Sequence, residues 1–302
     1  MTSERPPATA VVIPSYARPD RLADCLGALL DDPAGDFDVI VVDDGSPEPL
    51  ASLCARFGPR VRCLRQENRG PAAARNAGVA ASDAEFIAFT DDDCLPRPGW
   101  VGRLRGAWAG QDDRLVGGHV ENDLPENPYS SASQILCDYL YRYFGAEGGE
   151  APFFTSNNMG CSRSRFERLG GFDERFPLAA GEDRDFGLRW RADGGRLDYV
   201  PEAAIGHRHW LDPKSFWRQH TGYGRGAHCL HRRLDARGDD RPKREPLGFY
   251  VGLLAEPLRV RGLSGLKHSA LLTLSQAAMI AGYARERRAS APDDGAGSAV
   301  GR

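Results

Sequence analysis

Short apolar runs that alternate with helical patterns fill the first ninety residues and strongly limit the possible folds of this chain. Four such runs predict strands: Thr9–Ile13, Phe37–Val42, Val61–Arg65 and Glu85–Thr90. Three of them are nearly continuous apolar runs, as is typical of strands that are covered on both faces. Helical patterns lie between them, at residues 21–30 and after Gly70-Pro71. This alternation predicts βαβ units and an α/β fold with a mainly parallel sheet.

The pattern becomes less regular after Asp93. The expected elements are a strand at 115–121, a helix at 130–144, a polar strand-like stretch from Thr155, a short helix ending at Gly170-Gly171, a helix at 183–192, a strand at 197–207, and two helices after Pro246 separated by Gly262 and Gly265.

The composition indicates a globular chain that is large enough to bury a substantial core. Of its 302 residues, 41% are hydrophobic and 27% charged, which is far from the profile of a disordered chain. Seven scattered cysteines without CxxC spacing indicate neither a disulfide framework nor a zinc site, and fit a reducing cytoplasm. The N-terminus lacks a signal-peptide pattern. The uncharged stretch Ser269–Ala284 is 16 residues long. A spanning helix needs about 20 apolar residues, so no transmembrane helix is expected here.

The most specific chemical feature is a run of three carboxylates, Asp91, Asp92 and Asp93, directly after a buried strand. Ligands bind beyond the carboxyl ends of strands in a parallel α/β sheet, so this run indicates a site. Adjacent carboxylates raise one another's pKa unless a cation or donors compensate them. Oxygen ligands in this arrangement suit Mg²⁺ or Mn²⁺ bridging a diphosphate. The competing interpretation is a solvated acidic turn that caps a helix.

A second acidic pair, Asp43 and Asp44, also follows a buried strand. The first carboxylate can accept from a ribose hydroxyl and the second from a base N–H, and such contacts fix orientation in a cleft. The alternative is a common turn built by Asp-Gly-Ser. Two acidic strand ends in one sheet indicate a site more strongly than either does alone.

The order of five motifs resembles that of family 2 glycosyltransferases with the GT-A fold. The motifs are VVIPSYARPDRL from Val11, DVIVVDDGSP from Asp38, NRGPAAARNAG from Asn68, FTDDDC from Phe89 and GEDRDFGLRW from Gly181. The resemblance implies a Rossmann-like, mostly parallel sheet flanked by helices, with a C-terminal helical extension. It also implies glycosyl transfer from a nucleotide sugar, with a DXD motif in the aspartate run.

The resemblance further implies which residues bind the donor and the metal. The residues expected at the nucleotide sugar are Pro14, Tyr16, Asp43, Asp44, Arg69, Asp91 and Asp92. Asp93 would ligate Mg²⁺ or Mn²⁺, and a histidine after the last strand, His207 in preference to His209, would complete the metal site. The alternative for His207 is an ordinary interface histidine.

The expected mechanism is a single displacement. A metal would stabilise the negative charge that develops on the leaving diphosphate. The resemblance makes Asp183, in the Glu182-Asp183 pair, the catalytic base that accepts the acceptor's proton. Asp183 begins a helix, whose N-terminus favours the ionised form, and one displacement inverts the anomeric centre. The alternatives are Asp185 as the base, and a simple helix cap for Glu182 and Asp183.

The resemblance leaves several functions to compare. Membrane-embedded polysaccharide synthases of the family combine spanning helices with a QxxRW motif, whereas HTGY follows Gln219 here. We therefore expect non-processive transfer from a UDP, GDP or dTDP sugar to a saccharide or lipid-linked saccharide, in polysaccharide or glycolipid biosynthesis. The alternatives are a non-catalytic nucleotide-binding or scaffold protein of the same fold, and a nucleotidyltransferase. A nicotinamide-dependent enzyme would have GxGxxG where the chain has PSYARPD.

The expected organisation is a GT-A catalytic domain at 9–210, with a nucleotide-binding half at 9–95 and an acceptor-binding half at 96–210. A helical extension at 211–288 follows, and the disordered N-terminus and the flexible tail are expected at 1–8 and 289–302.

The helical extension has an apolar stripe and a basic excess. The stripe residues, spaced three or four apart, are Leu266, Ala270, Leu274, Ala277 and Ala281, and nine Lys/Arg against three Asp/Glu lie between Arg241 and Arg288. Such helices fit peripheral contact of 246–288 with an anionic membrane. The alternative is that the stripe packs on the catalytic domain. The expected location is the cytoplasm, with the inner face of the cell membrane under the first interpretation. Nucleic-acid binding is not expected, because the basic excess lies in one stretch with few aromatics.

Overall fold

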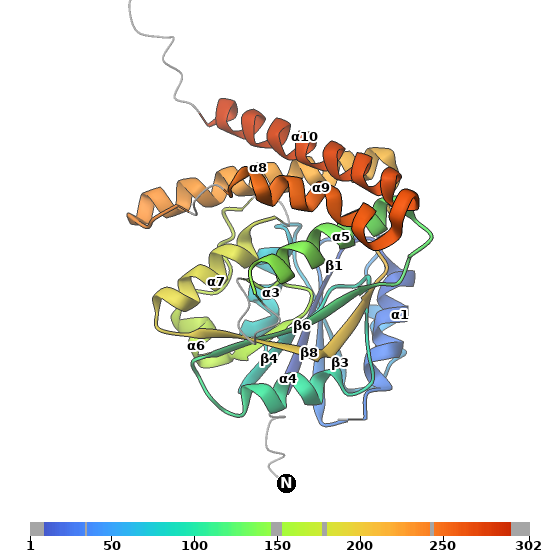
Figure 1. The fold of residues 1–302 in the computed structure, drawn as a ribbon. Coiled ribbons are helices and arrows are strands. Elements are labelled where there is room, and N and C mark those ends of the chain that lie inside the picture. Colours follow the sequence, from blue (N-terminus) through green and yellow to red (C-terminus); the bar gives the residue numbers. More distant parts are fainter. Residues whose placement is uncertain (1–8, 34, 146–152, 177–179, 242–244, 291–302) are drawn as a thin grey trace, which may run out of the picture.

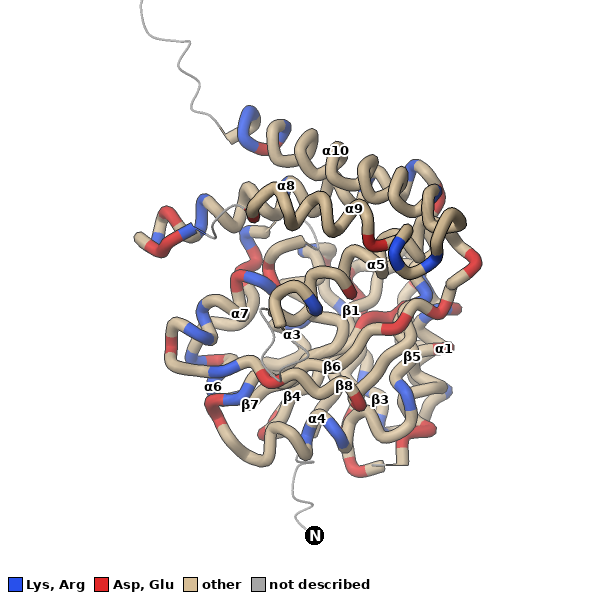
Figure 2. Tube along the Cα trace, in the orientation of Figure 1, with Lys and Arg blue, Asp and Glu red and all other residues tan. Residues whose placement is uncertain are grey.

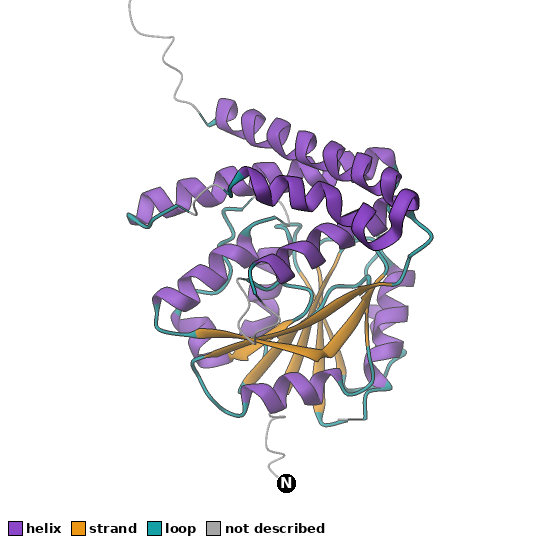
Figure 3. Cartoon of the chain, in the orientation of Figure 1, coloured by secondary structure: helices purple, strands orange, loops and turns teal. Residues whose placement is uncertain are grey.

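The computed structural model describes residues 9–33, 35–145, 153–176, 180–241 and 245–290. Helices flank both faces of an eight-stranded sheet, and a layer of long helices lies across one end of it (Figures 1 and 3). The strand order is β3-β2-β1-β4-β7-β6-β8-β5. The strands are β1 (Thr9–Ser15), β2 (Phe37–Asp43), β3 (Val61–Arg65), β4 (Phe86–Phe89), β5 (Cys94–Pro96), β6 (Arg114–Asn122), β7 (Met159–Ser162) and β8 (Arg196–His207).

The first four strands form the parallel part of the sheet that the sequence predicts, with all of their mutual pairings parallel. The apolar runs of β1, β2 and β4 are nearly continuous because both of their faces are covered. In β1, Val11 and Ile13 belong to one core with helices α1 (Pro19–Leu30), α2 (Ala51–Ala55) and α4 (Trp100–Trp108). Ala10 and Val12 belong to the opposite core with α3 (Pro71–Ala80), α6 (Arg163–Arg168) and α7 (Glu182–Ala192). The α/β fold class is therefore confirmed.

The second part of the sheet is mixed. Strand β7 pairs antiparallel with both β4 and β6, β6 pairs parallel with β8, and β5 pairs antiparallel with β8. The short elements α2, β5 and α4 are absent from the sequence prediction. Strand β5 reverses direction directly after the aspartate run, and its pairing places Cys94 opposite His207.

Long helices follow the sheet. They are α5 (Pro128–Tyr143), α8 (Pro213–Arg237), α9 (Leu247–Arg261) and α10 (Leu266–Ala289), with a short 3₁₀ turn, η2 (Gly262–Gly265), between the last two. The two helices predicted after Pro246 are confirmed. Within the described part of the chain, no helix is both long enough and apolar enough to cross a bilayer.

The predicted domain boundaries partly coincide with structural features. The sheet is continuous across residue 95, and the assignment of 9–95 to the nucleotide and 96–210 to the acceptor stays a prediction. Helix α10 ends at Ala289, close to the expected end of the extension. The predictions of a disordered N-terminus at 1–8 and of a flexible tail, for most of 289–302, concern residues outside the described ranges.

Glycines allow α8 and α10 to approach closely. A Cβ on Gly282 would overlap the carbonyl oxygen of Thr221, and a Cβ on Gly224 would overlap the carbonyl oxygen of Met279. The two backbones therefore touch at two points, which fixes how α10 is rotated about its own axis.

We expect Gly282→Ala to lower the free energy of unfolding by about 1–3 kcal/mol, because the added methyl group overpacks this contact. The matched control is Gly106→Ala in the middle of α4, where a Cβ meets open space. That change should stabilise the helix by about 0.5–1 kcal/mol. Urea unfolding of the two variants measures both effects, and equal effects of the two changes would contradict the tight contact.

Candidate active site

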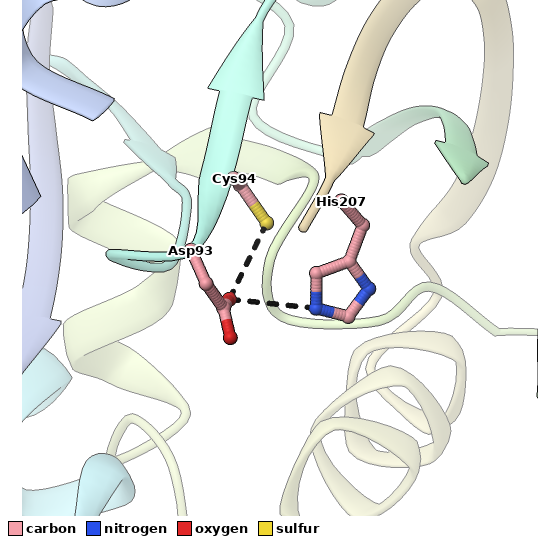
Figure 4. A group of neighbouring side chains, drawn as sticks. All are labelled: Asp93, Cys94 and His207. Atoms are coloured by element: carbon pink, nitrogen blue, oxygen red, sulfur yellow. Dashed lines mark hydrogen bonds and ion pairs between the residues drawn. The ribbon is translucent and has the colours of Figure 1, made fainter. Parts of the chain in front are cut away.

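The candidate site lies where β1, β2, β4 and β8 end. Strand β1 continues to Ser15, beyond its last pairing with β4 at Phe89, so the Ser15 hydroxyl reaches the aspartate run and donates to Asp92 Oδ2 at 2.7 Å. The β5–β8 pairing brings His207 to the same place from β8, which lies next to the edge strand β5. As a result Asp93, Cys94 and His207 face one another (Figure 4).

Asp93 is the most strongly compensated carboxylate of the run. Its Oδ1 lies 3.4 Å from His207 Nε2, and its Oδ2 lies 3.3 Å from the Arg18 guanidinium and 3.4 Å from that of Arg21. Burial by itself would raise the pKa of Asp93, but His207 and the two arginines together lower it well below its usual range. Asp93 is therefore an ionised carboxylate at neutral pH.

The two candidate histidines have different environments. Their rings stack with centroids 4.0 Å apart, and His207 is the one that faces Asp93. His209 is 8% exposed, and burial together with His207 lowers its pKa to about 3, so it is a neutral histidine behind the site. This geometry agrees with the preference for His207 over His209 as the metal ligand.

Asp92 and Asp91 have separate partners. Asp92 is 3% exposed, and burial and the neighbouring Asp93 raise its pKa to about 6, although Arg18 at 3.0 Å and Ser15 favour the ionised form. Asp91 pairs with Arg75 at 2.6 Å. Each carboxylate of the run thus has a cationic contact, and Arg18 is shared by Asp92 and Asp93.

Arg75 is a site residue that the sequence reasoning missed. Its side chain is 2% exposed, and it bridges Asp91 and, at 3.4 Å, Glu182. It therefore links α3 and the end of β4 to the first turn of α7. A signal for it exists in the sequence: an arginine follows three alanines inside the small, apolar segment PAAARNAG, where a charge is costly unless it is paired.

The three acidic residues of α7 have different environments. Glu182 is 2% exposed, and burial and Asp183 raise its pKa to about 8. Asp183 is half-buried and its pKa is raised, mainly by burial, which outweighs the helix N-terminus expected to keep it ionised. Asp185 is fully buried and pairs with Arg189 and Arg237, both at 2.7 Å. The geometry therefore favours Asp183 over Asp185 as a base.

The second acidic pair shapes the loops at the rim of the site. Asp43 accepts from the Ser46 and Leu50 amides and from Arg65. Asp44 accepts from the Gln66 side chain and from the amides of Arg69 and Gly70. Both carboxylates are buried, and both oxygens of each already have donors in the chain. The alternative interpretation, a turn built by Asp-Gly-Ser, agrees with the bond from the Ser46 amide to Asp43 and with the positive φ of Gly45. The nucleotide contacts of this pair stay predictions.

The remaining residues predicted for the donor lie around this rim. Pro14 is buried near the end of β1 and Tyr16, directly after the strand, is 48% exposed. The Arg69 side chain is 62% exposed and pairs with Glu174 at 2.5 Å. Tyr16 and Arg69 are thus available to a ligand.

Comparison with known proteins identifies the class of protein that has this fold and site. The sequence model of glycosyl transferase family 2 matches residues 10–170, more than half of the chain. The chain belongs to this family, as the motifs predict.

Two curated relatives are similar over the same region. The chain is 33% identical over 197 residues to pre-mycofactocin glycosyltransferase of Mycobacterium tuberculosis, covering 59% of this chain and 40% of the relative. It is 29% identical over 220 residues to validoxylamine A glucosyltransferase of Streptomyces hygroscopicus subsp. jinggangensis, covering 62% of this chain and 52% of the relative. The chain thus spans about half the length of these relatives.

Two solved structures share the fold. A mannosyltransferase from Pyrobaculum calidifontis in complex with GDP-Man and Mn²⁺ has a TM-score of 0.66 at 17% identity, covering 96% of this chain and 89% of that one. GalNAc-T7 with UDP, GalNAc and Mn²⁺ has a TM-score of 0.56 at 13% identity, covering 90% of this chain and 55% of that one. These similarities confirm the predicted GT-A fold.

The buried Glu182 predicts a pH-dependent stability. Its folded pKa of about 8 lies above its ordinary value of 4.5, so the folded state binds a proton more tightly than the unfolded state. The stability that comes from this proton is present below pH 4.5 and is lost as the pH rises to about 8.

We expect Glu182→Gln to remove this pH-dependent contribution to the free energy of unfolding. The unaltered chain should lose stability between pH 5 and pH 8, whereas the variant should not. The difference in free energy of unfolding, variant minus unaltered chain, should therefore rise by at least about 1.4 kcal/mol, the equivalent of a single pKa unit. Urea unfolding at several pH values measures it. A difference that stays constant over this range would show that Glu182 does not titrate as described.

Proposed function

We propose that this chain is a metal-dependent, inverting glycosyltransferase that moves a sugar from a nucleoside diphosphate sugar to an acceptor hydroxyl. The observation that carries the proposal is the convergence of Asp93 and His207 at the carboxyl edge of the sheet, in a chain of glycosyl transferase family 2. The Mn²⁺ and nucleotide ligands of the two structural relatives support a divalent cation and a nucleotide-sugar donor.

The donor atoms at this edge fit Mn²⁺ or Mg²⁺. Ligand atoms of Asp93, Cys94 and His207 lie within 4.8 Å of one another. Burial and the nearby aspartates raise the pKa of the Cys94 thiol well above its ordinary value, so in the metal-free chain this sulfur is a protonated thiol. Asp93 and His207 offer a carboxylate oxygen and an imidazole nitrogen, a pair that suits Mn²⁺. When bound, the cation would stabilise charge on the leaving diphosphate as a Lewis acid.

The chain supplies further positive charge at the same place. Arg18 and Arg21 contact Asp93 while their side chains stay 50% and 40% exposed. In the proposed complex these guanidiniums donate to phosphate oxygens, which favours the departing diphosphate. Tyr16, Pro14 and the loop held by Asp44 line the base pocket, and Asp91 contacts the ribose or the donor sugar.

Asp183 is the proposed catalytic base. Its raised pKa makes it a stronger proton acceptor than an ordinary carboxylate, and it lies at the N-terminus of α7 beside the Glu182–Arg75–Asp91 network. Arg75 thereby holds the start of α7 against the end of β4, so that the base and the donor aspartates keep a fixed relation.

The proposed acceptor is a saccharide or a lipid-linked saccharide that receives one or a few sugars. All seven cysteines are free in the structure, which supports the proposal of a cytoplasmic location. A non-catalytic nucleotide-binding protein would keep the donor site but show no turnover, so turnover with any acceptor distinguishes the two.

We expect Asp93→Asn to abolish the Mn²⁺-dependent part of donor binding, a loss of at least about tenfold in affinity. Calorimetric titration of UDP, GDP and dTDP sugars, with and without Mn²⁺, measures it. The control is Asp113→Asn, which removes a half-exposed carboxylate elsewhere and should bind like the unaltered chain. Equal Mn²⁺ dependence in Asp93→Asn would exclude Asp93 as a ligand.

Asp183→Asn should lower kcat by about 10²–10⁴-fold with little change in donor KM, because the proton acceptor is lost while the donor contacts remain. The control Asp193→Asn changes the opposite end of α7 and should leave kcat unchanged. NMR of the product's anomeric configuration completes the test. Retention of the donor's configuration would refute Asp183 as the base in a single displacement.

A further inference from the structure

The apolar stripe of α10 faces outward in the structure. Leu266, Ala270, Leu274, Ala277 and Ala281, the stripe read from the sequence, are all exposed. The face of α10 that packs on the rest of the molecule is different and consists of His268, Leu272, Ser275, Ala278 and Gly282. The interpretation that the stripe packs on the catalytic domain is therefore wrong.

The exposed face carries several large apolar side chains, although the packed face is apolar too, with Leu272 fully buried. Ile280 adds a side chain that is 71% exposed, and Leu266 and Leu274 are 55% and 38% exposed. At the η2 turn, Val260 and Leu263 extend the surface with exposures of 69% and 84%. Scattered apolar residues on a surface are ordinary, but a continuous row along one helix indicates an interaction surface.

Basic residues border this row at both ends. Arg259, Arg261 and Lys267 lie near its beginning, and Arg285, Arg287 and Arg288 lie at its end, and all are exposed. In Figure 2, α10 is free of charge between these basic ends. Glu286 is the one carboxylate among residues 257–290, and it pairs with Arg225 at 2.6 Å. Just before this range, Glu256 lies 4.0 Å from Arg259 and also pairs with Arg142. The excess of cations still gives the surface a net positive charge.

The helix has the dimensions and the position of a surface contact. At 1.5 Å per residue its 24 residues extend about 36 Å. It lies on the outer side of the helical layer (Figure 1), with α8 between it and the start of α7. The close contacts at Gly224 and Gly282 hold the apolar row outward.

We propose that the outer face of α10, together with the η2 turn, binds the surface of a membrane that contains anionic lipids. The apolar row would enter the boundary between headgroups and acyl chains, and the terminal cations would contact the lipid phosphates. A second copy of the chain is a poorer occupant, because a twofold contact between two such faces brings identical cations together. The inference concerns α10 alone and does not depend on glycosyl transfer.

Vesicle flotation with the full chain tests this surface. Vesicles of phosphatidylcholine alone are compared with vesicles of equal parts phosphatidylcholine and phosphatidylglycerol. We expect binding to the anionic vesicles only, and weakening of that binding as salt is added. A chain that stays at the bottom of the gradient with anionic vesicles at low salt overturns the proposal.

Ile280→Glu should reduce the vesicle partition coefficient at least about tenfold, since it removes an inserted side chain and adds a repelled charge. The control Ser52→Glu adds the same charge on exposed α2 and should bind like the unaltered chain. Arg287→Gln should weaken binding about fivefold. Thermal unfolding establishes that each variant is folded, and Leu274→Glu replaces Ile280→Glu if that variant is not.

Two further results would overturn the proposal. One is unchanged vesicle binding in both Ile280→Glu and Leu274→Glu. The other is a concentration-dependent dimer in sedimentation equilibrium that Ile280→Glu dissociates, which would assign the face to a second copy of the chain.

Discussion

Three neighbouring carboxylates at the end of β4, two of them buried, can lie together only because cations from other elements reach them. At an effective dielectric constant near 20, two like charges 4 Å apart repel by about 4 kcal/mol. Arg18 and Arg21 approach from the start of α1, Arg75 from α3, and His207 from β8. Each of these elements must therefore lie where it does for the run to remain largely ionised.

The same requirement explains the irregular half of the sheet. Strand β5 reverses the chain immediately after Asp93, and its three residues pair with the last residues of β8. This short pairing determines which histidine meets Asp93, because Cys94 is opposite His207 and His209 is left behind it. A register shift of one residue would turn the imidazole to the other face of the strand.

The sequence predicts the first half of the fold well because its signal there is local. Three of the four parallel strands are nearly continuous apolar runs, and β1 shows why: its alternate residues enter two different cores. The edge strand β3, VRCLR, is the exception. The signal is weak for β5 and β7, whose positions depend on pairing with distant segments and not on their own composition. The five motifs contain every predicted site residue except His207, and Arg75 also lies inside one of them. It was missed because its importance lies in contacts with Asp91 and with Glu182, the second of them 107 residues away.

Helix α10 shows a different limit of sequence patterns. Periodicity showed that one face of the helix is apolar, but it could not show which face packs. The packed face contains serine, histidine and glycine, and it packs because glycines let two backbones touch. In this helix, close backbone contact sets the orientation: Leu272 is buried on the packed face, whereas Leu266, Leu274 and Ile280 are left outside.

The arrangement around Asp93 also explains how a metal and arginines can share one carboxylate in the proposed complex. The two arginines lie on Oδ2, whereas His207 lies on Oδ1. A cation held by Asp93 and His207 would therefore not have to displace a guanidinium. Because both arginine side chains are about half exposed, they lose little burial when they turn towards phosphate oxygens. The lowered pKa of Asp93 ensures that metal binding requires no deprotonation at this carboxylate at neutral pH.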